Sequence, residues 1–202
     1  MPNHNSRLEA FCDGVFAIAI TLLIIEIRIP VPEHISTTHD LWLALKHILP
    51  SVFAVVLSFG IILITWVNHH SAMRLVHRSS YPFIYSNGFL LLTVVFMPFP
   101  TALLGEYLFT DHASPAVMLY SGIDGLQAIG WILITSTALS PNLTKDEKST
   151  SKMKEMKRNA YFAVLLYTIC AVVAFWFPLT IAGVITVIWI IWLVYGMSLT
   201  EK

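Results

Sequence analysis

Residues 7–25 read Arg7-Leu-Glu-Ala-Phe11-Cys12-Asp13-Gly-Val-Phe-Ala-Ile18-Ala-Ile-Thr21-Leu22-Leu-Ile-Ile25. The stretch places an arginine, a glutamate and an aspartate at the entrance of an apolar helix, whose residues 14–25 contain one hydroxyl and no charge. A membrane helix rarely carries an ionisable group without a functional or pairing reason. The stretch therefore predicts a membrane helix with an acid at its mouth, a pattern typical of helices that line an ion path.

The composition of the whole chain fixes its class. Of its 202 residues, 56% are hydrophobic and 12% are charged, and the mean hydropathy is +0.73. Soluble domains carry about 25% charged residues, and a soluble core of this size cannot bury so much apolar surface. We expect an integral membrane protein of one domain that binds no nucleic acid. Its beginning lacks the features of a cleaved secretory signal, so the first span is expected to stay in the mature protein.

A membrane-spanning helix needs about 20 largely apolar residues. The sequence offers six such segments, at about 9–29, 44–68, 82–104, 115–139, 159–177 and 179–199. These spans predict an all-α, single transmembrane domain of six helices over residues 1–202. Pro98 and Pro100 predict an end or a kink in the third span, and Trp176-Phe177-Pro178 predicts a tight hairpin between the last two.

The distribution of basic residues predicts the orientation. With the N-terminus inside, the inner segments hold ten of the twelve Lys and Arg residues, and the outer segments hold only Arg28 and Lys46. This asymmetry agrees with the positive-inside rule and predicts cytoplasmic N- and C-termini in a multi-pass protein of the cell membrane. The basic stretch 140–158 is interpreted as the main solvated inner linker, between the fourth and fifth spans.

The first span has a stripe of residues at regular spacing. On a helical wheel, Thr21, Leu22 and Ile25 fall within about 60° of Ile18. The 4-3 spacing of Ile18, Leu22 and Ile25 is the seam pattern of helices that pack around an axis, although ordinary apolar packing produces the same spacing. Asp13 falls on the far side of the wheel, so we expect it to point towards neighbouring helices as a structural anchor.

A second polar cluster, Thr65-Trp66-Val-Asn68-His69-His70, ends the second span. Trp66 and His69 are three residues apart and share a helix face, and both side chains can donate hydrogen bonds. Because this cluster lies at the same membrane depth as Asp13, we expect Trp66, His69 or both to bond its carboxylate. An interfacial role for the tryptophan is the alternative.

Other polar residues carry weaker signals. The histidines of the inner side show no metal-site spacing with Cys or Asp, so no metal site is expected. Asp124 stands inside the fourth span and is expected to face protein or water. The chain has no phosphate-binding loop, nucleophile elbow or His-Glu-x-x-His helix. It also lacks a Thr-Val-Gly-Tyr-Gly filter. We therefore expect neither an enzyme nor a cofactor, and any pore must select its ions differently.

The motif Arg7-x-x-x-Phe11-Cys12-Asp13-Gly14 resembles the Arg-x-x-x-Phe-Ser-Asp signature of the transmembrane-protein-175 family of potassium channels, specifically its single-repeat prokaryotic members. The end of the second span at 66–70 and the stretch 87–104, with its Pro-Phe-Pro sequence, are also similar to that family. Cys12 stands where the family usually has serine. A thiol is a weaker hydrogen-bonding group than a hydroxyl.

The resemblance implies a homotetramer in which four copies of the first span line a pore without a re-entrant filter. It implies that Ile18 forms the narrowest ring, that Thr21 supplies a hydroxyl ring, and that Leu22 and Ile25 form further apolar rings. The implied activity is passive conduction of potassium, moderately preferred over sodium, through a gate that works by width and wetting. The motif-anchor network that it implies comprises Arg7, Phe11, Cys12, Asp13, Trp66, Asn68 and His69.

Two other functions remain open from the residues. Asp13, Asp124 and the histidines are compatible with a secondary or proton-linked transporter, although the chain shows no internal repeat of the kind common in such carriers. An intramembrane enzyme or a structural assembly protein is the third candidate. Saturating, coupled flux would identify a transporter, and ion flux through the purified protein would exclude a purely structural role.

Overall fold

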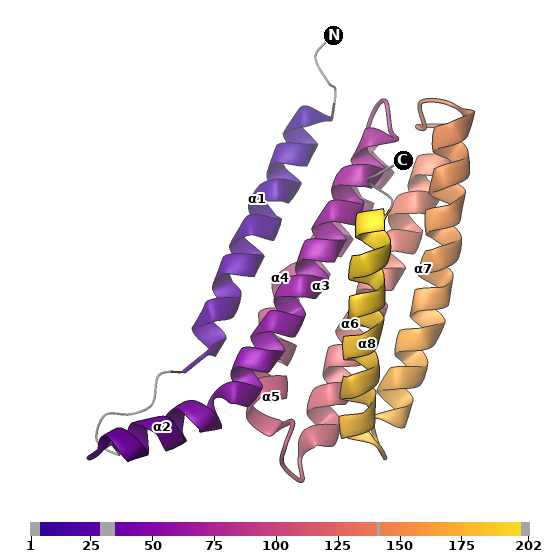
Figure 1. The fold of residues 1–202 in the computed structure, drawn as a ribbon. Coiled ribbons are helices and arrows are strands. Elements are labelled where there is room, and N and C mark those ends of the chain that lie inside the picture. Colours follow the sequence, from indigo (N-terminus) through magenta and orange to yellow (C-terminus); the bar gives the residue numbers. More distant parts are fainter. Residues whose placement is uncertain (1–4, 29–34, 141, 199–202) are drawn as a thin grey trace.

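The computed structural model describes residues 5–28, 35–140 and 142–198. These residues form helices, which run nearly parallel to one long axis except for a short helix at one end (Figure 1). In chain order the helices are α1 (Ser6–Leu22), the 3-10 turn η1 (Leu23–Glu26), α2 (Thr38–His47), α3 (Leu49–Arg74), α4 (Tyr81–Phe96), α5 (Pro98–Tyr107), α6 (Ala113–Leu139), α7 (Glu147–Val173) and α8 (Pro178–Ser198).

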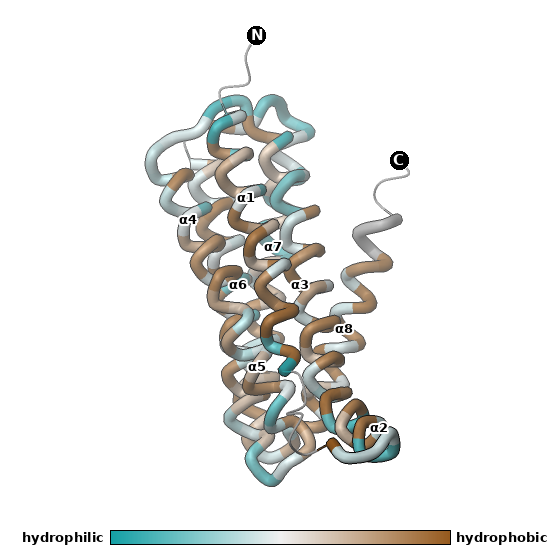
Figure 2. Tube along the Cα trace, turned by 90° about the vertical axis from the view of Figure 1, so that its left-hand side faces the viewer, coloured by the Kyte–Doolittle hydropathy of each residue, from teal (hydrophilic) through white to brown (hydrophobic). Residues whose placement is uncertain are grey.

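Five helical segments are long and apolar enough to cross a membrane. They are Ser6–Glu26, Leu49–Arg74, Tyr81–Tyr107, Ala113–Leu139 and Glu147–Val173, and Pro178–Val194 adds a shorter apolar helix. Apolar residues fill the middle of the bundle and polar residues gather at its two ends (Figure 2). These findings confirm the predicted all-α membrane fold, and the apolar α8 occupies the place of the sixth predicted span.

The second and third spans differ in detail from the expected ranges. Residues 44–47 belong to the separate helix α2, and the spanning helix α3 begins only at Leu49. A capping box starts α2, because Thr37 accepts a bond from the backbone N–H of Asp40 while the Asp40 carboxylate accepts one from that of Thr37. The predicted break in the third span is confirmed, since α4 ends at Phe96 and α5 begins at Pro98.

The solvated linker expected over 140–158 is much shorter in the structure. Helix α7 begins at Glu147, so residues 147–158 form its first turns. Asp146 is the N-cap, and its carboxylate accepts a 2.7 Å bond from the backbone N–H of Ser149. The segment before it is fixed to the α3–α4 connection by backbone bonds from His77 to Leu143 and from Lys145 to Leu75, both 3.0 Å. The hydropathy pattern missed these turns because they are polar and project beyond the apolar part of α7.

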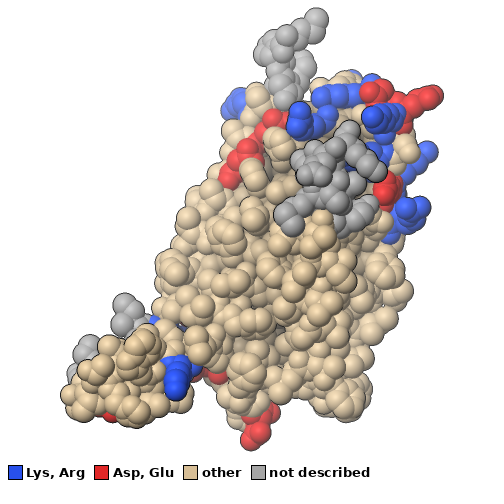
Figure 3. Space-filling model, in the orientation of Figure 1, with Lys and Arg blue, Asp and Glu red and all other residues tan. Residues whose placement is uncertain are grey.

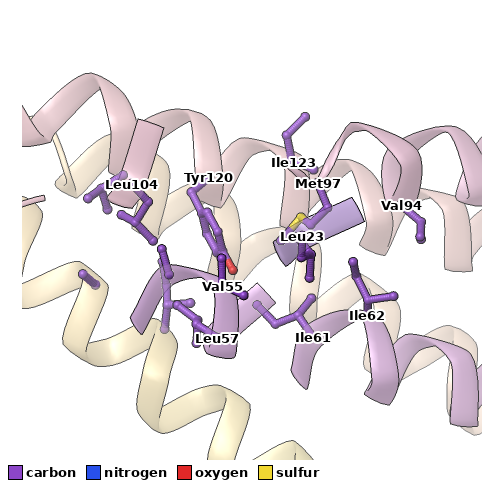
Figure 4. Close-up of a cluster of buried hydrophobic side chains, with 14 of the residues drawn as sticks. Leu23, Val55, Leu57, Ile61, Ile62, Val94, Met97, Leu104, Tyr120 and Ile123 are labelled. Carbon is purple, nitrogen blue, oxygen red and sulfur yellow. The ribbon is translucent and has the colours of Figure 1, made fainter. Parts of the chain in front are cut away.

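Four helices meet in the main hydrophobic core. Leu23 from η1, Ile62 from α3, Val94 from α4 and Tyr120 from α6 are all at most 1% exposed, and Figure 4 shows their side chains in one cluster. The Tyr120 hydroxyl bonds the hydroxyl of Ser58 at 2.8 Å. Burial of this set fixes η1, and with it the end of the first span, against the rest of the bundle.

Exposed charged residues gather at the two ends of the molecule, and most Lys and Arg lie at one of them. On the face shown in Figure 3, Lys and Arg gather around the beginnings of α1 and α7 and the end of α3. We call this the basic end; its residues include Arg7, Arg74, Lys148 and Lys152. The opposite end carries Glu106, in the last turn of α5, and Asp111, in the short connection between α5 and α6.

Candidate functional site

Helix α1 stands at one side of the bundle (Figure 1). Its residues divide into a buried face and an exposed face. Cys12, Phe16, Ala19 and Leu23 recur at spacings of three and four and are at most 1% exposed. This face packs on α3 and α4. The other face has no covering element within the described chain, and it carries the stripe predicted from the sequence.

The stripe residues are all exposed in the single chain. Ile18 is 60% exposed, Leu22 is 41% exposed and Ile25 is 67% exposed. The change from α-helix to the 3-10 turn η1 keeps Ile25 in line with Leu22, because residues three apart eclipse one another in a 3-10 helix. The structure therefore presents a continuous apolar strip, about two helical turns long, on the outside of the subunit.

Thr21 is the only hydroxyl between residues 14 and 25, and it lies on the exposed side. Its Oγ1 donates a 2.9 Å hydrogen bond to the backbone carbonyl of Ile18. This bond uses the single proton of the hydroxyl and leaves its oxygen lone pairs available. A threonine in this state can offer an oxygen to a passing cation.

Asp13 joins α1 to α3 near the basic end. The indole Nε1 of Trp66 donates a 2.9 Å hydrogen bond to Asp13 Oδ1. Trp66 also stacks on His70, with the ring centroids 6.2 Å apart. The predicted partner Trp66 thus reaches the carboxylate from α3, and Asp13 lies at the edge between the two faces of α1.

Of the two partners expected for Asp13, only Trp66 bonds it, and His69 bonds a residue of α4 instead. Its Nε2 lies 2.7 Å from Oδ1 of Asn87 on α4, while the amide nitrogen of Asn87 donates to the carbonyl of Phe83. His69 is 2% exposed, and its ring packs against Phe16 of α1 with centroids 5.5 Å apart. His69 supports α1 through this ring contact, and its hydrogen bond connects α3 to α4.

The remaining residues of the motif-anchor network occupy separate places. Arg7 is exposed in the first turn of α1, and Phe11 is 61% exposed. Two turns of α-helix separate Phe11 from Ile18, so both lie on the exposed face. Cys12 is fully buried in the apolar core, where a thiol packs well as a small hydrophobe. Asn68 lies on the other side of α3, on the wall of a cavity between α3, α6 and α7.

Asp124 is buried, at 2% exposure, and faces protein as predicted. Within the described residues no cluster of three or more His, Cys, Asp or Glu side chains has the arrangement of a metal site. The sequence analysis did not identify Asn87 as the partner of His69, nor the grouping of Asp124 with Gln127 and Trp189. The weak signal for the latter was the i, i+3 spacing of Asp124 and Gln127 on one apolar helix.

Comparison with known proteins gives consistent matches. A family model described as "Endosomal/lysosomal potassium channel TMEM175" matches residues 7–98. A potassium channel of Chamaesiphon minutus is 49% identical over 121 residues, which cover 60% of this chain and 59% of that relative. The alignment thus spans less than two thirds of that relative's length. A potassium channel of a Chryseobacterium species is 31% identical over 191 residues, covering 93% of this chain and 92% of the relative.

The fold is also similar to solved structures. The crystal structure of a lysosomal potassium-selective channel TMEM175 homolog from Chamaesiphon minutus superposes with a TM-score of 0.85. The two chains are 36% identical, and the match covers 95% of this chain and 97% of the other. The similarity therefore extends over nearly the whole bundle.

Proposed function

Because the chain belongs to the TMEM175 family, we propose that it is a potassium-selective cation channel whose pore is lined by α1. The relatives of this chain are named potassium channels. The observation that carries the proposal is the division of α1 into a buried face and an exposed apolar face that contains Ile18 and Thr21.

The pore is proposed to form between four copies of the chain. One subunit leaves the Ile18–Leu22–Ile25 strip uncovered, with 41% to 67% of each side chain exposed. A helix facing only lipid needs large apolar side chains, whereas this face also carries Gly14 and Thr21. Four such faces turned towards a common axis would cover the strip and place the Thr21 hydroxyl beside the ion path.

The proposed constriction is a ring of four Ile18 side chains. An apolar ring that excludes water blocks ions, because an ion cannot cross a constriction that is not wetted. Small rotations of α1 would widen and hydrate the ring. The contacts of α1 with Trp66 and His69 support this view, since they hold its other face and leave the Ile18 side free to move.

Selectivity is proposed to arise from dehydration. Potassium holds its water less tightly than sodium does, so it crosses an apolar neck with few oxygen ligands at a lower cost. Thr21 hydroxyl oxygens would replace part of the lost hydration. Since no rigid cage of carbonyl oxygens is proposed, we expect only a moderate preference for potassium over sodium.

The proposed location is the cell membrane, with both termini in the cytoplasm. The concentration of Lys and Arg at the basic end supports this orientation, since cytoplasmic loops carry an excess of basic residues. In the purified protein reconstituted in oriented liposomes, cysteine labels at Ser79 and Ser114 would test it. Only the Ser114 label should react with an impermeant reagent added to the outer side.

The channel itself is tested by recording the purified protein in a planar bilayer, with potassium on one side and sodium on the other. We expect single-channel steps and a reversal potential displaced towards that of potassium, and a tetrameric mass in native mass spectrometry. Flux that saturates and depends on a second ion or on protons would identify a transporter and contradict the proposal. An inert tetramer would also contradict it.

A further inference from the structure

A cavity of about 270 Å³ lies between α3, α6, α7 and α8, away from α1. None of the residues that line it belongs to α1, so it is separate from the proposed pore. Its lining includes Asp124 and Gln127 of α6, which are buried, and Tyr167 of α7 and Trp189 of α8, which are half-buried. Lys152 and Glu155, in the first turns of α7, lie at its mouth near the basic end.

Four polar atoms of residues that line the cavity have no hydrogen-bond partner among the residues that the structure describes. These atoms are both carboxylate oxygens of Asp124, Nε2 of Gln127 and Nε1 of Trp189. Asp124 is 2% exposed and Gln127 is 5% exposed. Most buried polar groups in proteins are paired, and each exception requires an explanation. Two side chains more than nine-tenths buried, with unpaired acceptors and an unpaired donor in one cavity, point to an absent ligand.

The position of the indole of Trp189 has a specific structural cause. Gly60 on α3 has no side chain, and the ring of Trp189 lies directly against its backbone; a Cβ atom at residue 60 would collide with the ring. Gly60 therefore lets the ring approach α3 and places its N–H group beside the cavity. The Thr65 hydroxyl donates a 2.8 Å bond to the Ile61 carbonyl and also lies 3.1 Å from Oε1 of Gln127, which places this amide against α3.

The chemistry of the cavity favours an organic cation over a metal ion. A carboxylate buried in an apolar site keeps its charge only beside a positive partner. Lys152 is too far away to be that partner, because it precedes Tyr167 by fifteen residues, about 22 Å along α7. The unpaired N–H groups of Gln127 and Trp189 repel a bare metal ion but can donate to an oxygen of a ligand. The walls include the rings of Trp131 and Tyr167, and aromatic faces attract ammonium groups.

We propose that this cavity binds a protonated amine that carries an oxygen acceptor, as in a small amino alcohol. The ammonium group pairs with the carboxylate of Asp124, and the oxygen accepts a hydrogen bond from Gln127 Nε2 or Trp189 Nε1. The same chemistry occurs in free ethanolamine and in the head group of an aminophospholipid. The first enters from the aqueous mouth beside Lys152, and the second enters from the bilayer.

The test uses the purified, intact protein at fixed pH and ionic strength. Ethanolamine is titrated and followed by saturation-transfer NMR in detergent without aminophospholipid; saturable binding with one molecule per chain is expected. Ethylene glycol, which lacks the amine, should not bind, and potassium at equal concentration should not displace ethanolamine. In a second arm, nanodiscs of mixed phosphatidylethanolamine and phosphatidylglycerol are analysed by native mass spectrometry. Retained phosphatidylethanolamine identifies the lipid source, and binding of ethanolamine alone identifies the soluble source.

The variants separate this site from other sites. Asp124→Asn keeps the shape of the side chain and removes its charge, and it should weaken binding about tenfold or more. Asp111→Asn, in the exposed connection at the opposite end, is the matched control and should bind like the parent. Trp189→Phe keeps an aromatic ring but removes the indole N–H, and it should weaken binding less than Asp124→Asn. This second variant tests the proposal if Asp124→Asn does not fold.

Three results would overturn the proposal. The first is the absence of both saturable ethanolamine binding and retained phosphatidylethanolamine, which would mean that water alone fills the cavity. The second is unchanged binding in Asp124→Asn, and the third is full displacement by potassium. All these measurements report binding and not ion flux, so their results do not depend on whether the proposed channel function is correct.

Discussion

The indole N–H of Trp66 on α3 donates to the carboxylate of Asp13 on α1 across 2.9 Å. This bond connects residues 53 positions apart, and it lies one turn from the contact between His69 and Phe16. A polar bond and a ring contact therefore hold the same segment of α1 against α3. The opposite face of α1, with Ile18, remains uncovered.

Asp13→Ala is expected to damage assembly more than ion preference, with less tetramer, a lower melting temperature and weak flux. Its bond to Trp66 predicts coupling between the two residues, because residues in contact share an interaction energy. In a cycle of Asp13→Ala, Trp66→Phe and the double variant, unfolding in mixed micelles should show a coupling of about 0.5–1.5 kcal/mol. Normal tetramers with altered ion preference in Asp13→Ala would instead indicate that the acid faces the ions.

Asn87→Ala should lower the free energy of unfolding by about 1–3 kcal/mol, because it leaves the buried Nε2 of His69 without its partner. In double-mutant cycles His69→Ala should couple to Asn87→Ala and be nearly additive with Asp13→Asn. Melting curves of the single and double variants measure both quantities. Strong coupling of His69 to Asp13, with none to Asn87, would contradict the hydrogen bond described here.

The membrane fold follows from the sequence because runs of apolar residues of sufficient length have few alternatives in lipid. Pro98 breaks the third span for an equally local reason, since proline lacks the N–H that a continuous helix requires. Helix α2 and the first turns of α7 were missed because both are polar or amphipathic. The capping residues Thr37 and Asp146 mark their starts, and hydropathy does not detect such signals.

The inner anchor was only partly predictable. Because Trp66 and His69 share a helix face, the sequence predicted that both contact α1, and they do. The spacing does not show which polar group each side chain bonds. Asn87 lies within reach of His69 because α4 packs on α1 and α6. The cavity could not be predicted either. Trp189 and Asp124 line it together because α8 packs against α3 and α6, and the sequence does not show this packing.

Ile18→Asn is expected to raise cation flux and to reduce the preference for potassium, because an amide side chain wets the proposed apolar ring. Liposome flux and reversal potentials measure the two effects. Ile24→Asn is a matched control, since Ile24 is 64% exposed against 60% for Ile18 but lies outside the stripe. Unchanged conductance and reversal potential in Ile18→Asn would contradict a gate at this position.

Thr21→Val keeps the shape of the side chain and deletes its oxygen. A reduced potassium conductance, or a lower ratio of potassium to sodium permeability, is expected from the loss of a ligand during dehydration. The Thr21 bond to the Ile18 carbonyl offers the competing explanation that the hydroxyl only serves the helix backbone. Recordings of Thr21→Ser, which retains the oxygen, provide the control. Parent-like behaviour of Thr21→Val would favour the backbone role.

The start of α7 is predicted to be sensitive to acid. Hydrogen bonds from the backbone and side chain of Ser149 lower the pKa of the Asp146 carboxyl below its usual value. A carboxyl with a lowered folded-state pKa contributes stability that is present above its unfolded pKa and is lost as the pH falls through its folded pKa. Below about pH 4, the first turn of α7 should therefore fray, with faster amide exchange at Ser149 and Thr150. Asp146→Asn keeps an N-capping side chain that does not titrate, so its exchange at these amides should lack this acid-dependent step. Equal acid sensitivity in the parent and in Asp146→Asn would show that another group controls the beginning of the helix.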